Sequence, residues 1–569
     1  MIEPHFTLRV NFTHEDKAAK GLRSLREPLA APIPPVYFTA EEAVDMYPRL
    51  LLLGERGAGK TTFAKDLAAK TAATYVDLAL GRDIPAEGPL ILDGLDRIAE
   101  TELAPLFEAI DDRPVVLLGD GAVVKGWKFP AGITIHTLKP LEQTERAAFL
   151  ESKGIAAPAA LSEAAGNPAL FALATSMSEP AETAEDIIDI WLRNEPERAE
   201  AGFQALSTGA SANRAIDGLV AGKFLSSRDD ASVARLFLDD SALWTPSLAS
   251  LLRRMPQRAE TLAPLLISGT SDAALRGALL VADFIPDDTA VLERLQDLIE
   301  SGRLSALERN RAAQILSVRG DPRDLEALCL IPGGRFTMGS TTHPNSTPVH
   351  HVQVDTFSIG RYPVTNGQYA RFVAATERTW VSPAAHDPAL RNVPATDLTW
   401  HDARAYCDWL TARWREEKRI GDDQVVRLPT EPEWERASRG DVEDGGDDIV
   451  YPWGKGWNSD AANSEESGFN APCAVGLFPS GQSPYGCLDM AGQVWEWTTT
   501  LWGDGMATPS FTYPYADDGR EDPDAGPAIR RVLRGGCFSS TSLKACCSYR
   551  GSLEPNGFWR GNGFRIVVS

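Results

Sequence analysis

The sequence lacks any long hydrophobic run and any closely spaced pair of cysteines. No stretch of about eighteen apolar residues occurs, so no membrane-spanning helix is expected, and the charged opening MIEPHFTLRVNFTHEDK predicts no signal peptide. The seven cysteines are scattered without a CxxC pair, which argues against a disulfide framework or a zinc site. Together these absences predict a protein of the reducing cytoplasm.

Basic residues are also in short supply. The 56 Lys and Arg residues are outnumbered by 79 Asp and Glu residues, so the formal net charge is -23. Such a chain repels phosphate backbones at long range, and nucleic acid is not expected as a partner. Hydrophobic residues make up 43% and charged residues 24%. These are the proportions of ordinary globular proteins, and the length predicts a multidomain chain.

Four regions follow one another. Residues 1–40 end in the proline-rich LREPLAAPIPPVYF and are expected to form an arm, whereas residues 41–194 alternate apolar runs with helical stretches, which predicts an α/β domain with a parallel sheet. In residues 195–329, Leu and Ala recur at helical spacing, which predicts an all-α domain similar to HEAT-type repeats. Residues 330–569 hold most of the tryptophans and only short apolar runs. This last domain is expected to be held by loops and aromatic packing.

The α/β domain contains a phosphate-binding motif. GERGAGKT fits GxxxxGK[ST], follows the apolar run RLLLL and opens a helix, so backbone amides are expected to turn around phosphate oxygens. In LILDGLDR, Asp93 is the expected Walker B carboxylate and Asp96 lies close enough to join it; two turn aspartates are the alternative. The expected ligand is ATP or ADP with Mg²⁺. The predicted P-loop residues are Gly54, Gly57, Gly59, Lys60, Thr61 and Thr62.

DGLD after a buried strand resembles the NACHT branch of the STAND nucleotide-binding switch proteins, and GNPALFALA is similar to the GNP segment of that family. The resemblance implies that Pro168 packs on the adenine. Two positions depart from the family: Arg97 stands where a second acidic residue is usual, and PVVLLGDG lacks an arginine after the sensor strand. With these departures, the resemblance implies a nucleotide-held switch with weak or absent ATPase activity.

Six motifs in the last domain resemble the formylglycine-generating enzyme, or sulfatase-modifying factor, family. They are FTMGS, VHHVQVDTFSIGRYPVTNGQYARFV, RLPTEPEWERASRG, YPWGKGW, GCLDMAGQVWEWT and RVLRGG…GFRIV. The resemblance implies an α+β variant of the C-type lectin fold, with Trp434, Trp453 and Trp497 in its core. It also implies a Ca²⁺ site, because hard oxygen ligands suit this ion; a loop without metal is the alternative. The implied calcium ligands are Asp489, Gly492, Val494 and Glu496.

The catalytic residues of that family are not matched. Its copper enzymes use a pair of cysteines, and the corresponding positions here are Ser540 and Ala545, while Cys546 and Cys547 are adjacent. Iron-dependent relatives of the ergothioneine type would need three metal-binding histidines. The candidates in this domain are His343, His350, His351 and His401. No catalytic residue is therefore predicted.

The end of the chain is similar to the variable proteins of diversity-generating retroelements, in which a fixed RGG…GFR bracket encloses a diversified segment. Here the bracket is formed by Arg534–Gly536 and Gly563–Arg565, which are expected to fix the ends of a binding surface in residues 537–562. Aromatic and small polar residues are typical of such surfaces. A merely divergent formylglycine-type domain is the alternative. The predicted ligand-binding residues are Phe538, Ser540, Ser542, Leu543, Tyr549, Ser552, Leu553, Phe558 and Trp559.

These observations predict a nucleotide-regulated receptor. Its C-terminal domain would bind a protein or peptide ligand, and its ATP/ADP switch would respond by a change of state or by assembly into a homo-oligomer. A formylglycine-generating-type oxidase and a non-catalytic scaffold are the alternatives.

Overall fold

The computed structural model describes residues 7–14, 36–81, 83–124, 127, 129–130, 132–193, 196–208, 211, 214–441, 450–506 and 508–569. Most of the predicted N-terminal arm lies outside these residues. The described part of it is not an irregular arm, because Arg9–Thr13 forms strand β1, which pairs antiparallel with β2 (Tyr37–Thr39). Alternating buried side chains, among them Val10 and Phe12, give β1 an apolar face, and this face explains its place in the core.

The N-terminal part of the molecule is built around a five-stranded sheet in the order β4-β5-β6-β3-β7, with every strand parallel to its neighbours. Leu50–Leu53 of β3 are fully buried, as expected for a central strand covered on both faces. The elements are α2 (Ala40–Met46), β3 (Arg49–Gly54), α3 (Lys60–Lys70), β4 (Thr74–Asp77), β5 (Leu90–Asp93), α4 (Leu103–Ile110), β6 (Val115–Asp120), α5 (Gly121–Val124) and β7 (Thr134–Thr137).

Helices make up the middle of the chain. Among the described residues from 143 to 319 all regular structure is helical, and short polar caps such as the capping boxes at Thr183 and Ser305 begin individual helices. The α-helices are α6 (Gln143–Lys153), α7 (Pro168–Ala174), α8 (Ala184–Leu192), α9 (Arg198–Ser207), α10 (Arg214–Leu225), α11 (Asp230–Asp239), α12 (Ser241–Arg254), α13 (Arg258–Leu266), α14 (Asp272–Val281), α15 (Thr289–Ser301) and α16 (Ala306–Arg319).

The described residues of the C-terminal part combine short strands with three α-helices and long loops. Its two four-stranded sheets have the orders β12-β17-β11-β8 and β15-β14-β13-β16. Trp434 and Trp497 are fully buried, whereas Trp453 is half-buried and stacks on Tyr451. The elements are β8 (Leu328–Ile331), β9 (Gly334–Met338), β10 (His350–Val354), β11 (Phe357–Gly360), α17 (Asn366–Thr376), α18 (Trp400–Glu416), β12 (Val426–Arg427), α19 (Glu431–Arg439), β13 (Trp495–Gly503), β14 (Arg530–Arg534), β15 (Gly551–Leu553), β16 (Asn562–Gly563) and β17 (Val567–Val568).

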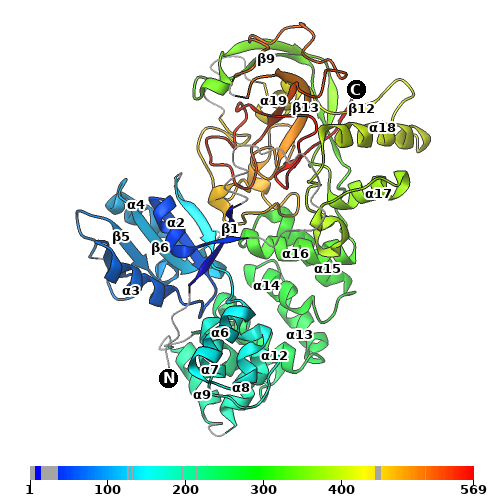
Figure 1. Ribbon diagram of the computed structural model, residues 1–569. Helices are drawn as coiled ribbons and strands as arrows, with labels where there is room; N and C mark the ends of the chain where they lie inside the picture. Colours follow the sequence, from blue (N-terminus) through cyan, green and yellow to red (C-terminus); the bar gives the residue numbers. More distant parts are fainter. Residues whose placement is uncertain are drawn as a thin grey trace.

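The three parts pack against one another (Figure 1). Leu477 and Phe478 of the C-terminal part belong to the same hydrophobic core as helices α11 to α16. The buried guanidinium of Arg309 on α16 forms an ion pair with Asp460, and Asn310 accepts a hydrogen bond from Ala474 N at 3.2 Å. The helices therefore support the C-terminal part through both apolar and charged contacts. Within the described residues, no helix has the length and apolar character needed to cross a bilayer.

Candidate functional site

The predicted nucleotide-binding residues meet in one pocket at the carboxyl edge of the parallel sheet. The pocket has a volume of about 880 Å³. Gly57 and Gly59 both have φ +83°, a conformation that favours glycine and turns the loop into α3. The predicted residues that line the pocket are Gly57, Gly59, Lys60, Thr61, Thr62, Asp93, Asp96 and Pro168. Gly54 lies beneath it at the end of β3, where its carbonyl accepts a hydrogen bond from Lys60 Nζ at 2.7 Å.

Lys60 supplies a positive charge inside the pocket. Its ammonium group also donates to Glu55 O at 2.9 Å. Burial lowers its pKa, while the negative charges of Asp120, Asp96 and Asp93 act in the opposite direction. An ammonium group that is partly desolvated among carboxylates is well placed to bind a phosphate group, since a buried cation gains most from a nearby anion.

The carboxylates come from the ends of neighbouring strands. Asp93 ends β5 and accepts a hydrogen bond from Tyr75 Oη at 3.2 Å, and Asp96 Oδ1 accepts one from the backbone amide of Asp120 at the end of β6, at 3.0 Å. Because adjacent parallel strands end at the same edge, residues distant in sequence are brought together there. Carboxylate oxygens in this position suit the coordination of Mg²⁺.

Arg56 is a pocket residue that motif reasoning did not select. Its Nε donates to Asp120 Oδ2 at 2.9 Å, and its Nη1 is buried without a hydrogen-bond partner among the described residues. The end of β6 lacks the arginine that the family resemblance leads one to expect, but Arg56 lies beside Asp120 at the end of this strand. The only sequence signal was a charged residue at a variable P-loop position, and its partner Asp120 could not be assigned from the motif.

The GNP segment contacts the P-loop directly. Asn167 caps α7 by accepting from Ala169 N at 3.0 Å, and its Nδ2 donates to Arg56 O at 2.9 Å. Ala169 N also donates to Gly57 O at 3.2 Å. Thr7 and Leu8, which precede β1, line the same pocket and were not predicted to do so. The pocket therefore joins three distant segments of the chain.

The predicted calcium loop fits a cation only in part. Asp489 is buried and accepts a hydrogen bond from Gly476 N at 2.8 Å, and burial raises the pKa of Asp489 to about 6. Glu496 instead pairs with Arg565, whose Nε and Nη2 lie 2.6 Å and 2.7 Å from its two carboxylate oxygens, and it also accepts from Trp434 Nε1 at 2.7 Å. A guanidinium thus neutralises one of the two expected acidic ligands.

Both ends of the predicted binding segment are fixed by buried arginines. Arg534 contacts Glu431 at 3.0 Å and Glu435 at 2.5 Å, and all three side chains are fully buried. Burial alone would raise the pKa of Glu435, but Arg534 and Arg439 beside it hold that pKa below its usual value. At the other end Arg565 is fully buried against Glu496. The bracket residues therefore anchor the segment, as predicted.

Most of the segment between these anchors is buried, which corrects the expectation of an exposed surface. Phe538 and Leu553 are fully buried, and Trp559 is 2% exposed, because they pack in one core cluster with α18. Ser540, Ser542, Tyr549 and Ser552 are buried as well. Phe558 is half-buried, and Leu543 is 72% exposed. Besides Asn556, the exposed residues of the segment are Thr541 and Leu543. They lie in the turn Thr541–Lys544, which is called the exposed tip below.

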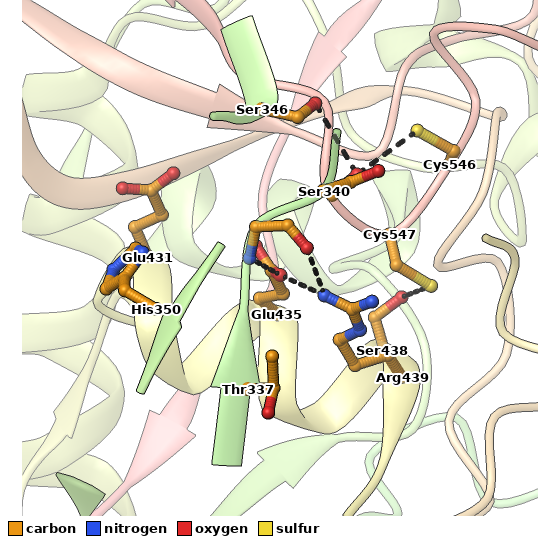
Figure 2. A network of polar contacts seen from close by, with 12 residues as sticks. Thr337, Ser340, Ser346, His350, Glu431, Glu435, Ser438, Arg439, Cys546 and Cys547 are labelled. Atoms are coloured by element: carbon orange, nitrogen blue, oxygen red, sulfur yellow. Dashed lines mark hydrogen bonds and ion pairs between the residues drawn. The ribbon is translucent and has the colours of Figure 1, made fainter. Parts of the chain in front are cut away.

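The adjacent cysteines face different partners (Figure 2). Cys547 Sγ accepts a hydrogen bond from Ser438 Oγ at 3.1 Å, whereas Cys546 Sγ lies 3.5 Å from Leu543 O and 4.0 Å from Ser548 Oγ. Burial raises the pKa of Cys546, and it raises that of Cys547 to about 12. Within the part of the chain that the structure describes, no group of three or more His, Cys, Asp and Glu residues could hold a metal ion.

Comparison with known proteins defines the C-terminal domain. A family model described as the sulfatase-modifying factor enzyme 1-like domain matches residues 316–569. A formylglycine-generating enzyme of Mycobacterium tuberculosis is 37% identical over 264 residues, covering 37% of this chain and 86% of the enzyme. The chain therefore belongs to the sulfatase-modifying factor family.

Other members differ in their described activities. The inactive C-alpha-formylglycine-generating enzyme 2 of Bos taurus is 30% identical over 227 residues, covering 30% of this chain and 69% of that protein. The hercynine oxygenase of Mycolicibacterium smegmatis is 30% identical over 246 residues, covering 37% of this chain and about half (54%) of that enzyme. Family membership therefore does not by itself assign an activity.

Two solved structures share the region at low identity. PvdO from Pseudomonas aeruginosa is 22% identical with a TM-score of 0.34, and Treponema denticola variable protein 1 is 19% identical with a TM-score of 0.31. Each match covers 42% of this chain and 94% of the other chain.

Proposed function

We propose that the chain is a nucleotide-regulated ligand-binding protein. The N-terminal part would bind ATP or ADP with Mg²⁺ as a STAND-type switch, and the C-terminal domain would bind a protein or peptide ligand. The convergence of the P-loop, Asp93, Asp96 and Pro168 on one pocket supports the first half of this proposal. The pocket volume of about 880 Å³ is that of an ordinary small-molecule site.

The exposed tip Thr541–Lys544 is the proposed ligand-binding surface. Leu543 would provide an apolar anchor, and the flanking backbone is held by the buried arginines of the bracket. A rigid base under an exposed apolar residue reduces the entropy lost on binding. Ligand binding would be read out as a change in nucleotide state or in assembly into homo-oligomers.

We also propose that the C-terminal domain binds Ca²⁺, with fewer ligands than the family resemblance implies. A Ca²⁺ ion would take Asp489 with the main-chain oxygens of Gly492 and Val494, and Glu496 would join only on leaving Arg565. The buried carboxylate of Asp489 supports a cation here, since a nearby positive charge offsets its desolvation.

The alternative is a formylglycine-generating-type oxidase, which membership of the family favours. Ser540 and Ala545 provide no thiols, and the high pKa of Cys547 disfavours the thiolate that binds a metal. Copper-dependent oxidation of a cysteine peptide by the purified chain would establish the alternative.

Titration with a fluorescent ATP analogue and Mg²⁺ tests the switch. Lys60→Ala is expected to abolish measurable binding, because Nζ is the central cation of the pocket. Lys65→Ala is the matched control, since Lys65 is an exposed lysine on the same helix. Equal binding by both variants, or none by the unsubstituted chain, would leave a non-catalytic scaffold as the better description.

A further inference from the structure

Residues 7–13, which include strand β1, connect the pocket with the C-terminal domain. Figure 1 shows β1 between the sheet and the C-terminal part. Thr7 and Leu8 line the pocket, and both Leu8 methyl groups would lie 3.9 Å from a β-carbon placed on Gly59 of the P-loop. Asn11 follows three residues later, about 10 Å along an extended strand. One short element therefore spans the distance between the pocket and the neighbouring domain.

Asn11 connects three elements through a single amide group. Its Nδ2 donates to Gly468 O at 2.8 Å and Phe469 O at 3.2 Å. Its Oδ1 accepts from Thr137 N of β7 and from Asn470 Nδ2, both at 2.8 Å. Two donors and two acceptors are the full hydrogen-bonding capacity of this side chain. A shift of β1 would therefore break bonds to the C-terminal domain.

Gly468, Phe469 and Asn470 belong to residues 463–470, called the 463–470 loop here. This loop also lies against the sheet. His136 Nδ1 of β7 is 2.8 Å from Asn470 Nδ2. Tyr47, which follows α2, is hydrogen-bonded to the side chain of Glu465. A β-carbon on Gly468 would lie 2.7 Å from Ile135 Cγ2, so the loop and β7 are in close contact. The sheet that carries the P-loop thus contacts the loop at several points.

The same loop contacts the proposed ligand-binding segment. The backbone amide of Glu465 donates to Ser540 O at 2.9 Å, and the amide of Ser542 donates to Glu466 Oε1 at 2.8 Å. These two bonds lie on either side of Thr541 and next to the exposed Leu543. A continuous series of contacts therefore runs from the pocket through β1 and the loop to the tip Thr541–Lys544.

We propose that β1 and the 463–470 loop couple nucleotide binding to the conformation of the Thr541–Lys544 tip. This inference rests on the proposed function, since it requires a nucleotide in the pocket. A ligand that seats against Leu8 changes the position of β1, and the Asn11 amide transmits that change to the loop. Coupling is reciprocal, so a partner bound at the tip alters nucleotide affinity by the same factor.

Hydrogen exchange on the full chain, with and without Mg²⁺ and ATP, tests this coupling. Nucleotide is expected to change exchange at the amides of Glu465 and Ser542 by about fivefold or more. Asn11→Ala should bind ATP as the unsubstituted chain does and lose that change. Asn310→Ala, which removes a different contact with the C-terminal domain, should retain it.

If Asn11→Ala unfolds, Asn11→Asp takes its place in the hydrogen-exchange experiment. It keeps the acceptor for Thr137 N and loses both donors to the loop. Nucleotide binding without any change at Glu465 and Ser542 would overturn the coupling alone, as would an unchanged response in a folded Asn11 variant. Absence of nucleotide binding in the unsubstituted chain would overturn the proposed function and, with it, the coupling.

Discussion

Replacing Arg534 by methionine should destabilise the C-terminal domain more than any surface charge change. The substitution keeps much of the side-chain volume but removes the guanidinium that contacts Glu431 and Glu435, all three groups being fully buried. It also removes donors to the carbonyl oxygens of Cys547 and Ser548. Removing one partner of a buried ion pair costs about 3–5 kcal/mol, because the remaining charge is desolvated without compensation.

Chemical unfolding of the full chain, followed by tryptophan fluorescence, measures this loss. Arg378→Met is the matched control, since the pair of Arg378 with Asp402 is exposed and should contribute less than about 1 kcal/mol. Equal unfolding midpoints for the two variants would refute the reasoning.

The stability lost on replacing Arg534 by methionine should also depend on pH. The pKa of Glu435 is lowered in the folded state, so its contribution is present above its ordinary value of 4.5 and is lost as pH falls through the lowered value. The difference in the free energy of unfolding between Arg534→Met and the unsubstituted chain should therefore shrink on acidification below pH 4.5. A difference that stays constant with pH would contradict the assignment of the loss to charge.

Three further outcomes are expected. Because burial raises the pKa of Asp489 to about 6 from 3.8, its ionisation costs stability as pH rises through this range. Ca²⁺ should therefore raise the melting temperature more at about pH 8 than at about pH 5. Asp489→Asn should remove this effect. Equal shifts in the unsubstituted chain and in Asp489→Asn would exclude this site. In chemical unfolding, Leu543→Ser should change the free energy of unfolding by less than about 0.5 kcal/mol, whereas Leu553→Ala should cost about 2–5 kcal/mol. Similar losses in the two variants would contradict the exposure of Leu543 and the burial of Leu553. Arg56→Met should weaken Mg²⁺–ATP binding about tenfold in a fluorescence titration, and unchanged affinity would exclude Arg56 from phosphate binding.

The convergence of the predicted nucleotide-binding residues on one pocket could be foreseen because the motifs that carry them are local. A P-loop is a turn of a few residues whose glycines and helix start set the positions of Lys60 and Thr61. Asp93 followed from the end of a recognisable apolar run. Leu8 and the pair of Arg56 with Asp120 were not predictable, because they depend on how β1 and β6 lie beside the P-loop. That arrangement is set by tertiary packing, which no short motif records.

The binding segment was harder to predict because its composition is ambiguous. Aromatic and small polar residues are typical of binding surfaces, yet aromatic side chains also dominate the cores of loop-rich domains. Phe538 and Trp559 serve the core here, with ring centroids 5.7 Å apart. The bracket could be predicted because Arg534 and Arg565 recur in a family motif, whereas the burial of the residues between them depends on packing against α18.

The position of the exposed tip links the two halves of the proposal. Leu543 lies one residue beyond Ser542, whose amide donates to Glu466, so a partner bound at the proposed tip would displace the same loop that β1 contacts. A scaffold would need no such series of contacts between the proposed ligand-binding tip and the proposed nucleotide pocket. If the coupling exists, Leu543→Asp should abolish the effect of the partner on nucleotide affinity while leaving nucleotide affinity itself unchanged, because Leu543 lies outside the pocket. Nucleotide titration of this variant with and without the partner distinguishes a receptor from a scaffold: a partner effect that survives Leu543→Asp would place ligand recognition elsewhere on the domain.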